Sequence, residues 1–172
     1  MRGLETTTPS NPTAMNTPRD PAAPPLTYFT QVRCDVGEVL SLGAAPMGER
    51  RVVALVGGEV VGPGLNGRIV PGGTDWQWNR SDHTLEIAAH YMIETAEGAR
   101  IEVQSNGLRH GPPEVLARLT RGEDVPAHEY FFRTLMRFAT GHAVYEHLNR
   151  VMALACGRRE ARRVMLDVWQ IG

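Results

Sequence analysis

The chain has 172 residues, of which 42% are hydrophobic, enough for one domain with a buried core but too few for two. Lysine and arginine total 18 against 19 aspartate and glutamate residues, so the formal net charge is -1. This balance gives no electrostatic reason to expect nucleic acid or a membrane surface as a partner, and we expect neither.

Residues 1–25 are rich in threonine, proline, asparagine and serine and have no continuous apolar run. They therefore do not resemble a secretory signal or a membrane span. A segment of this kind cannot bury enough apolar surface to offset the entropy lost on ordering. We predict a disordered tail over residues 1–25 and a single β-barrel domain over residues 26–172.

The two cysteines, Cys34 and Cys156, both lie in apolar segments with a strand-like pattern. No Cys-x-x-Cys motif and no surplus of cysteines is present, which favours a reducing, cytoplasmic location. A buried, inert thiol is the commoner explanation for each of them than a metal ligand or a nucleophile.

From residue 26 onward, short runs of β-branched and aromatic residues alternate with glycine- and proline-rich turn signals. Residues 26–36 and 38–42 form the first two runs, and residues 52–56 continue the pattern. The paired glycines Gly57-Gly58 predict a bulge or a sharp bend rather than a regular strand. Counting such runs along the whole chain gives about nine or ten strands.

Two of the expected strands have informative faces. In residues 74–78, alternation places Asp75 and Gln77 on one face and Trp76 and Trp78 on the other, and one of these faces must point inward. The longest expected strand, residues 85–95, carries an apolar face. Its members are Leu85, Ile87, Ala89, Tyr91 and Ile93.

One helix is expected between two strands. Pro112 and Pro113 suit its first turn, Val115 and Leu119 belong to its apolar stripe, and Gly122 suits its end. The preceding strand is predicted to end at residue 105, and the next to run over residues 130–138. Because one helix cannot cover so many strands, closure of the sheet is the better solution. We predict an all-β fold, a closed antiparallel β-barrel of about 8–10 strands with one short helix near residues 112–121.

The motif census excludes several chemistries. The sequence has no Walker loop, dinucleotide fingerprint, Gly-x-Ser-x-Gly elbow, His-Glu-x-x-His motif or EF-hand loop. Six histidines are scattered at spacings that favour no metal site. We therefore expect no metal and no cofactor.

Several polar residues in β-rich surroundings remain as candidates, and each also has a structural explanation. Asp75 could cap a turn, but inside a barrel it would be desolvated and could act as a general base. Tyr91 could simply pack in the core. Arg109 and Arg133 could tie the helix ends to the sheet or hold a ligand.

The chain resembles the uncharacterised family catalogued as domain of unknown function 3237. The matching stretches are residues 62–77, residues 107–118, Tyr130-Phe-Phe-Arg-Thr134 and Leu148-Asn-Arg150. The resemblance covers essentially everything from Leu26 to Ile171 and implies a compact, self-associating β-barrel. It implies no activity.

Our leading hypothesis is a barrel whose lumen binds a small organic molecule and performs cofactor-free acid-base chemistry such as cyclisation, isomerisation, dehydration or a retro-addition. The catalytic candidates are Asp75, Tyr91 and Arg109. The ligand-binding candidates are Trp76, Gln77, Glu86, His110, Tyr130 and Arg133. The alternative is a non-catalytic ligand-binding or assembly barrel in which the same groups bond only to protein.

Overall fold

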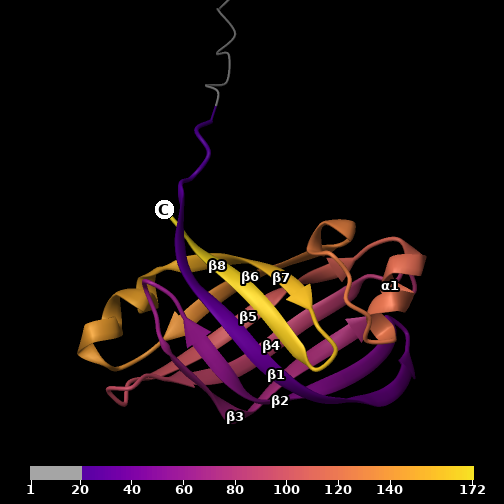
Figure 1. Cartoon of the computed structure of the whole chain (residues 1–172), viewed down its shortest axis with the longest axis horizontal. Helices are drawn as coiled ribbons and strands as arrows, with labels where there is room; N and C mark the ends of the chain where they lie inside the picture. Colours follow the sequence, from indigo (N-terminus) through magenta and orange to yellow (C-terminus); the bar gives the residue numbers. More distant parts are fainter. Residues whose placement is uncertain (1–20) are drawn as a thin grey trace, which may run out of the picture.

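In the computed structural model, which describes residues 21–172, eight strands form a closed antiparallel barrel in which β8 returns to pair with β1 (Figure 1). The strands are β1 Leu26–Ala45, β2 Gly48–Val61, β3 Gly67–Asn79, β4 Leu85–Glu94, β5 Arg100–His110, β6 Phe131–Ala139, β7 Met152–Arg159 and β8 Arg163–Ile171. The predicted closed barrel is confirmed. Of the predicted tail, residues 1–20 lie outside the described residues.

The strands are fewer and longer than the pattern suggested, because glycine- and proline-containing positions that usually interrupt strands lie within them as irregularities. Gly37 lies inside β1, Gly57-Gly58 lie inside β2, and residues 71–73 lie inside β3, each beside a shift in pairing register. At Gly58 the backbone has φ 128° and a Cβ would lie 2.0 Å from the Arg33 carbonyl oxygen. Only glycine fits so close an approach, and the bulge expected there is confirmed.

Strand β5 continues five residues beyond its predicted end at Ser105. Residues 107–109 pair on one side with β4 and on the other with β6, and His110 pairs with β6. The prediction failed because the inward positions of this extension are Gly107 and Arg109, which lack the apolar signature of a core-facing strand. The extension matters for function, since it carries Arg109 to one end of the barrel.

The predicted helix is α1, Pro113–Thr120, and its apolar residues Val115 and Leu119 are buried as expected. Just beyond the helix, Gly122 has a φ of 77°, and the Gly122 and Glu123 N–H groups donate to the carbonyls of Leu119 and Arg118. This pattern is the hydrogen bonding of a left-handed helix end, so the predicted role of Gly122 is confirmed. Two short 3-10 helices follow, η1 Ala127–Glu129 and η2 Ala143–Arg150. No helix in residues 21–172 has the length and apolar character needed to cross a membrane.

The two ends of the barrel differ. The helix α1 lies at one end, and η2, which follows β6, lies at the other (Figure 1). The η2 end is filled by apolar side chains: Leu148 is completely buried, and the rings of Phe29 and Phe138 meet edge to face with centroids 6.0 Å apart. Thr30 Oγ1 also donates to the Leu65 carbonyl oxygen at 2.8 Å, which anchors the β2–β3 loop. The hollow part of the barrel therefore lies toward α1.

Candidate functional site

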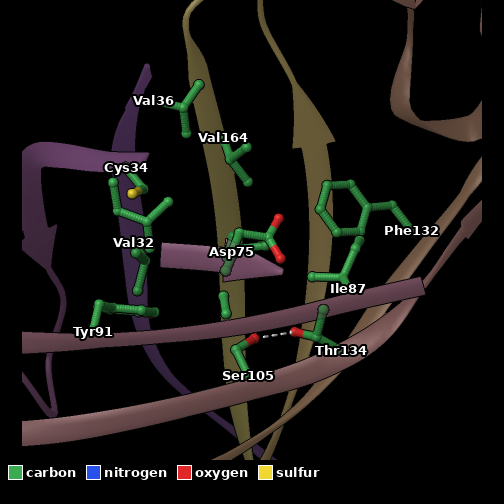
Figure 2. A pocket seen from close by; sticks show the side chains of 13 residues that line it. Val32, Cys34, Val36, Asp75, Ile87, Tyr91, Ser105, Phe132, Thr134 and Val164 are labelled. Carbon is green, nitrogen blue, oxygen red and sulfur yellow. Dashed lines mark hydrogen bonds between the residues drawn. The ribbon is translucent and has the colours of Figure 1, made fainter. Parts of the chain in front are cut away.

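An apolar cavity, the inner chamber, occupies the middle of the barrel (Figure 2). Its empty space is about 450 Å³, including the part that is continuous with solvent. The lining residues are Val32, Cys34, Val36, Leu55, Asp75, Ile87, Ala89, Tyr91, Ser105, Phe132, Thr134, Val164 and Leu166. The wall is mostly apolar with a few polar groups, as the walls of small-molecule sites usually are.

A second cavity, the outer chamber, adjoins the first and shares five wall residues with it. The shared residues are Val36, Asp75, Ile87, Phe132 and Val164. Its empty space is about 440 Å³, and its own wall includes Arg51, Gln77, Arg109 and Arg159. Arg51 and Arg109 also line a groove against Leu116 of α1. A track therefore runs from the groove at α1, past the arginines and Asp75, into the apolar interior.

Asp75 lies on β3 where the two chambers meet, and its carboxylate points into the cavity (Figure 2). The carboxylate accepts hydrogen bonds from Gln77 Nε2 at 2.5 Å and from the Ala88 N–H at 3.2 Å. Burial raises the pKa of Asp75 above its ordinary value, although these two hydrogen bonds and the charges of Arg109 and Arg51 oppose the shift. A carboxylate with a raised pKa is a stronger base than an ordinary one, which suits it to take and return a proton.

Three arginines surround the outer chamber, because β2, β5 and β7 each bring one to the α1 end. Arg51 is engaged by protein: its Nε donates to Gln77 Oε1 at 3.0 Å, and its Nη1 lies 4.0 Å from Glu49 Oε2. Arg109 differs, because its Nε is buried and has no hydrogen-bond partner among residues 21–172. Burial, followed by repulsion from Arg51 and Arg159, lowers the pKa of Arg109 to about 10. At neutral pH it remains a cation.

Arg159 is held at the end of β7 by main-chain groups. Its Nη1 donates to the Arg163 carbonyl oxygen at 3.2 Å and its Nη2 to the Ala161 carbonyl oxygen at 3.1 Å. Its own N–H donates to the hydroxyl of Tyr130 at 2.8 Å. Tyr130 is 6% exposed and lies just before β6, so this candidate positions the β7 end instead of lining either chamber.

Polar groups in the inner chamber divide into satisfied and unsatisfied ones. Ser105 Oγ donates to Thr134 Oγ1 at 2.9 Å across β5 and β6 (Figure 2). The hydroxyl of Tyr91 is buried and has no hydrogen-bond partner in the part of the chain that the structure describes. Burial raises the pKa of the Cys34 thiol to about 12, so this group stays protonated, as the predicted inert role requires.

Four predicted ligand-binding residues lie outside the barrel. Trp76 is 39% exposed and stacks with the guanidinium of Arg50, which lies 5.2 Å from its ring centroid. Glu86 accepts a hydrogen bond from Arg80 Nη1 at 3.1 Å. His110 and Arg133 both pack against the ring of Phe131, which is exposed on the outside of the barrel. Strand alternation turns all four outward, so none of them can contact a molecule bound in the chambers, while Asp75, Gln77, Tyr91 and Arg109 do face these chambers.

The profile of the family described as protein of unknown function (DUF3237) matches residues 24–171. The chain belongs to this family. A UPF0311 protein of Rhodopseudomonas palustris is 39% identical over 144 residues, which are 84% of this chain and 94% of the relative. A crystal structure of a conserved protein of unknown function from the same species has a TM-score of 0.83 at 37% identity, covering 88% of this chain and 99% of that one.

A relative with a named activity is more distant. A protein of Penicillium herquei named as a hydroalkoxylation enzyme is 29% identical over 83 residues, 48% of this chain and 55% of the relative. A solved enzyme from Penicillium herquei has a TM-score of 0.69 at 23% identity, covering 91% of this chain and 100% of that one, which shows a likeness of fold.

The DUF3237 site also contains residues that sequence reasoning did not select. Arg51 and Arg159 line the outer chamber, and Ser105 and Thr134 line the inner one. Alternation held a usable signal for both arginines: Arg51 shares a face with buried Val53, and Arg159 follows buried inward positions of β7. Within residues 21–172, no group of three His, Cys, Asp or Glu side chains could hold a metal ion.

Proposed function

We propose that this DUF3237 protein binds a small, largely apolar organic molecule in the two chambers and catalyses a proton transfer on it without a cofactor, using Asp75 as general base and acid. One observation carries the proposal. The carboxylate of Asp75 lies between an apolar chamber and an arginine-lined one, and burial raises its pKa. An apolar wall would hold the carbon skeleton beside a carboxylate able to exchange a proton.

The reaction class that we propose is the addition of a hydroxyl group across an activated carbon–carbon double bond, or its reverse. The name of the Penicillium herquei relative, a hydroalkoxylation enzyme, supports this choice. In the addition, the Asp75 carboxylate takes the hydroxyl proton while the oxygen attacks one alkene carbon. The carboxyl group then returns this proton to the neighbouring carbon. One O–H bond and the π bond of the alkene break, one C–O bond and one C–H bond form, and no electrons are gained or lost overall.

Neighbouring groups can assist this step. When the alkene is conjugated to a carbonyl group, negative charge develops on the carbonyl oxygen, and the guanidinium groups of Arg51 and Arg109 are suited to stabilise it. The hydroxyl of Tyr91, which has no partner in the described chain, is available to donate a hydrogen bond to the substrate. Gln77 donates to Asp75 and so holds the carboxylate in its orientation.

A direct test uses an ortho-hydroxyphenyl propenyl ketone, which closes to a methylchromanone and loses its conjugated absorbance. Asp75→Asn should lower the rate of closure by about two to four powers of ten. The matched control is Glu86→Gln, an outward-facing carboxylate on the neighbouring strand β4, and it should leave the rate unchanged. In deuterium oxide the product should gain one deuterium on carbon, and the rate should fall with acidification at a pH above the ordinary pKa of aspartate.

The alternative is a non-catalytic binding barrel, and the same variants separate it from the enzyme. If Asp75→Asn binds the ketone as tightly as wild type and neither protein accelerates its closure, the acid-base proposal is refuted and a binding role is left. Self-association, which the family resemblance implies, is likewise a proposal. Sedimentation equilibrium of the purified protein tests it.

A further inference from the structure

The guanidinium group of Arg109 is the least satisfied charge in the cavity. Its Nε is buried and has no hydrogen-bond partner within residues 21–172, and the favourable charge of Asp75 is outweighed by burial and by repulsion from Arg51 and Arg159. Arg109 is partly buried, and a cation that loses hydration without gaining a partner is costly, so such groups are usually paired. A guanidinium that stays unpaired beside a cavity has the geometry to receive an anion from outside the chain.

The charges around Arg109 define how much negative charge the site can accept. Three guanidinium groups line the outer chamber, and Asp75 is the one carboxylate in the same wall. Arg51 already lies 4.0 Å from Glu49 at the rim. Arg109, Arg159 and Asp75 together therefore leave one unit of positive charge. A single anionic charge balances the site, whereas a dianion such as a phosphate monoester would be repelled by Asp75.

The inner chamber determines what must be attached to this anion. Beyond Asp75 the wall consists mainly of aliphatic side chains and the ring of Phe132. Of its polar groups, Ser105 and Thr134 are bonded to each other, and the hydroxyl of Tyr91 and the thiol of Cys34 are uncharged (Figure 2). A charged group would lose its hydration there without compensation, so the inner chamber suits a hydrocarbon or aromatic body. The two chambers together match a molecule with one anionic end and one apolar end.

We infer that the ligand of this cavity is an amphipathic monocarboxylate, whose carboxylate group binds Arg109 with support from Arg159 and whose apolar body fills the inner chamber. The carboxylate points toward the groove at α1, and the body lies beside Asp75. This inference rests on the proposed function, since it places the ligand in the same cavity, but it concerns affinity and not turnover.

The test compares hydrocinnamate with its neutral isostere, hydrocinnamamide, by isothermal titration calorimetry on the full-length protein. Both probes have one phenyl ring and a short chain, and they differ in charge at one end. Wild type should bind the carboxylate at least about tenfold more tightly than the amide, because hydrogen bonds to charged groups are roughly twice as strong as neutral ones.

Variants assign this preference to Arg109. Arg109→Met keeps the apolar stem and should reduce the preference to less than about twofold, while Arg109→Lys keeps the charge and should retain part of it. The control is Arg80→Gln, an outer-surface arginine that pairs with Glu86 and Asp82, and it should bind as wild type does. Thermal unfolding of each variant shows that the comparison is made on folded protein.

Several results would overturn the inference. It fails if wild type binds the amide as tightly as the acid, if hydrocinnamate does not bind at millimolar concentration, or if Arg109→Met keeps the full preference. The first two results need only wild-type protein. This outcome can be told apart from that of the catalytic proposal, because Asp75→Asn should still bind the carboxylate more tightly than the amide. If the protein shows this preference but wild type has no turnover, the catalytic proposal has failed. If wild type has turnover but no preference for the carboxylate, the inference about the ligand has failed.

Discussion

Replacing Tyr91 or Tyr130 by Phe removes one hydroxyl group in each case, but the two substitutions should have opposite effects on stability. Both side chains are 6% exposed, but the Tyr130 hydroxyl accepts the Arg159 N–H at 2.8 Å, whereas that of Tyr91 has no partner among residues 21–172. Tyr130→Phe leaves an N–H group without its acceptor, which costs about 1–3 kcal/mol. Tyr91→Phe removes a polar group that burial penalises, so its free energy of unfolding should equal or exceed that of wild type.

Urea denaturation followed by far-ultraviolet circular dichroism measures both differences. For a chain of this size, each kcal/mol corresponds to a shift of about 2–4 °C in Tm, so thermal scans give an independent check. If the Tyr91 hydroxyl serves the ligand, Tyr91→Phe should also weaken binding or turnover while it keeps or gains stability. The reasoning is refuted if Tyr91→Phe destabilises the protein as much as Tyr130→Phe does.

Two further predictions concern the inner chamber. Burial raises the pKa of Asp75 above its ordinary value of 3.8, so the folded protein keeps this proton at pH values where the unfolded chain has lost it. The contribution of Asp75 to the free energy of unfolding therefore falls as the pH rises from the unfolded-state pKa through the folded-state pKa. The free energy of unfolding of Asp75→Asn should therefore exceed that of wild type near neutral pH. This difference should shrink toward zero below pH 3.8. Urea titrations at several pH values measure it, and a difference that does not change with pH would contradict the prediction. Ser105→Ala should cost about 1–2 kcal/mol, since it leaves the buried Thr134 hydroxyl unpaired, and adding Thr134→Val should recover much of that loss in a double-mutant cycle.

The barrel could be predicted from the sequence because its signals are local. Alternation along residues 85–95 correctly placed Tyr91 and Ile87 inside, and Pro112 with Gly122 bounded the helix. The alternation in residues 74–78 identified two faces, and the structure shows that the Asp75 face points inward. The errors came where a strand tolerates a residue that usually breaks strands, as at Gly37 within β1.

The site was harder to predict than the fold because it depends on register between strands. Arg51 faces the cavity beside Gln77 through β2–β3 pairing, a relation that no single segment contains. Arg133 and His110 were as plausible as Arg109 from residue type alone. Neighbouring residues of a strand face opposite sides of the sheet, however, and Arg109 faces inward while His110 and Arg133 face outward. Residue type therefore did not show which of these side chains faces the cavity.

Within one apolar chamber, the neighbours of an ionisable group decide whether it stays reactive. Cys34 and Asp75 both line the inner chamber, and burial raises the pKa of each. Around Cys34, the negative charges of Asp35 and Asp75 add to the shift, and the thiol stays neutral and inert. Asp75 instead accepts hydrogen bonds from Gln77 and Ala88 and faces the guanidinium groups of Arg109 and Arg51. These interactions oppose the rise in its pKa and so favour the ionised carboxylate. The arginines at the α1 end therefore have two roles in our proposal, because the same positive charge that draws an anion into the cavity keeps Asp75 able to exchange a proton.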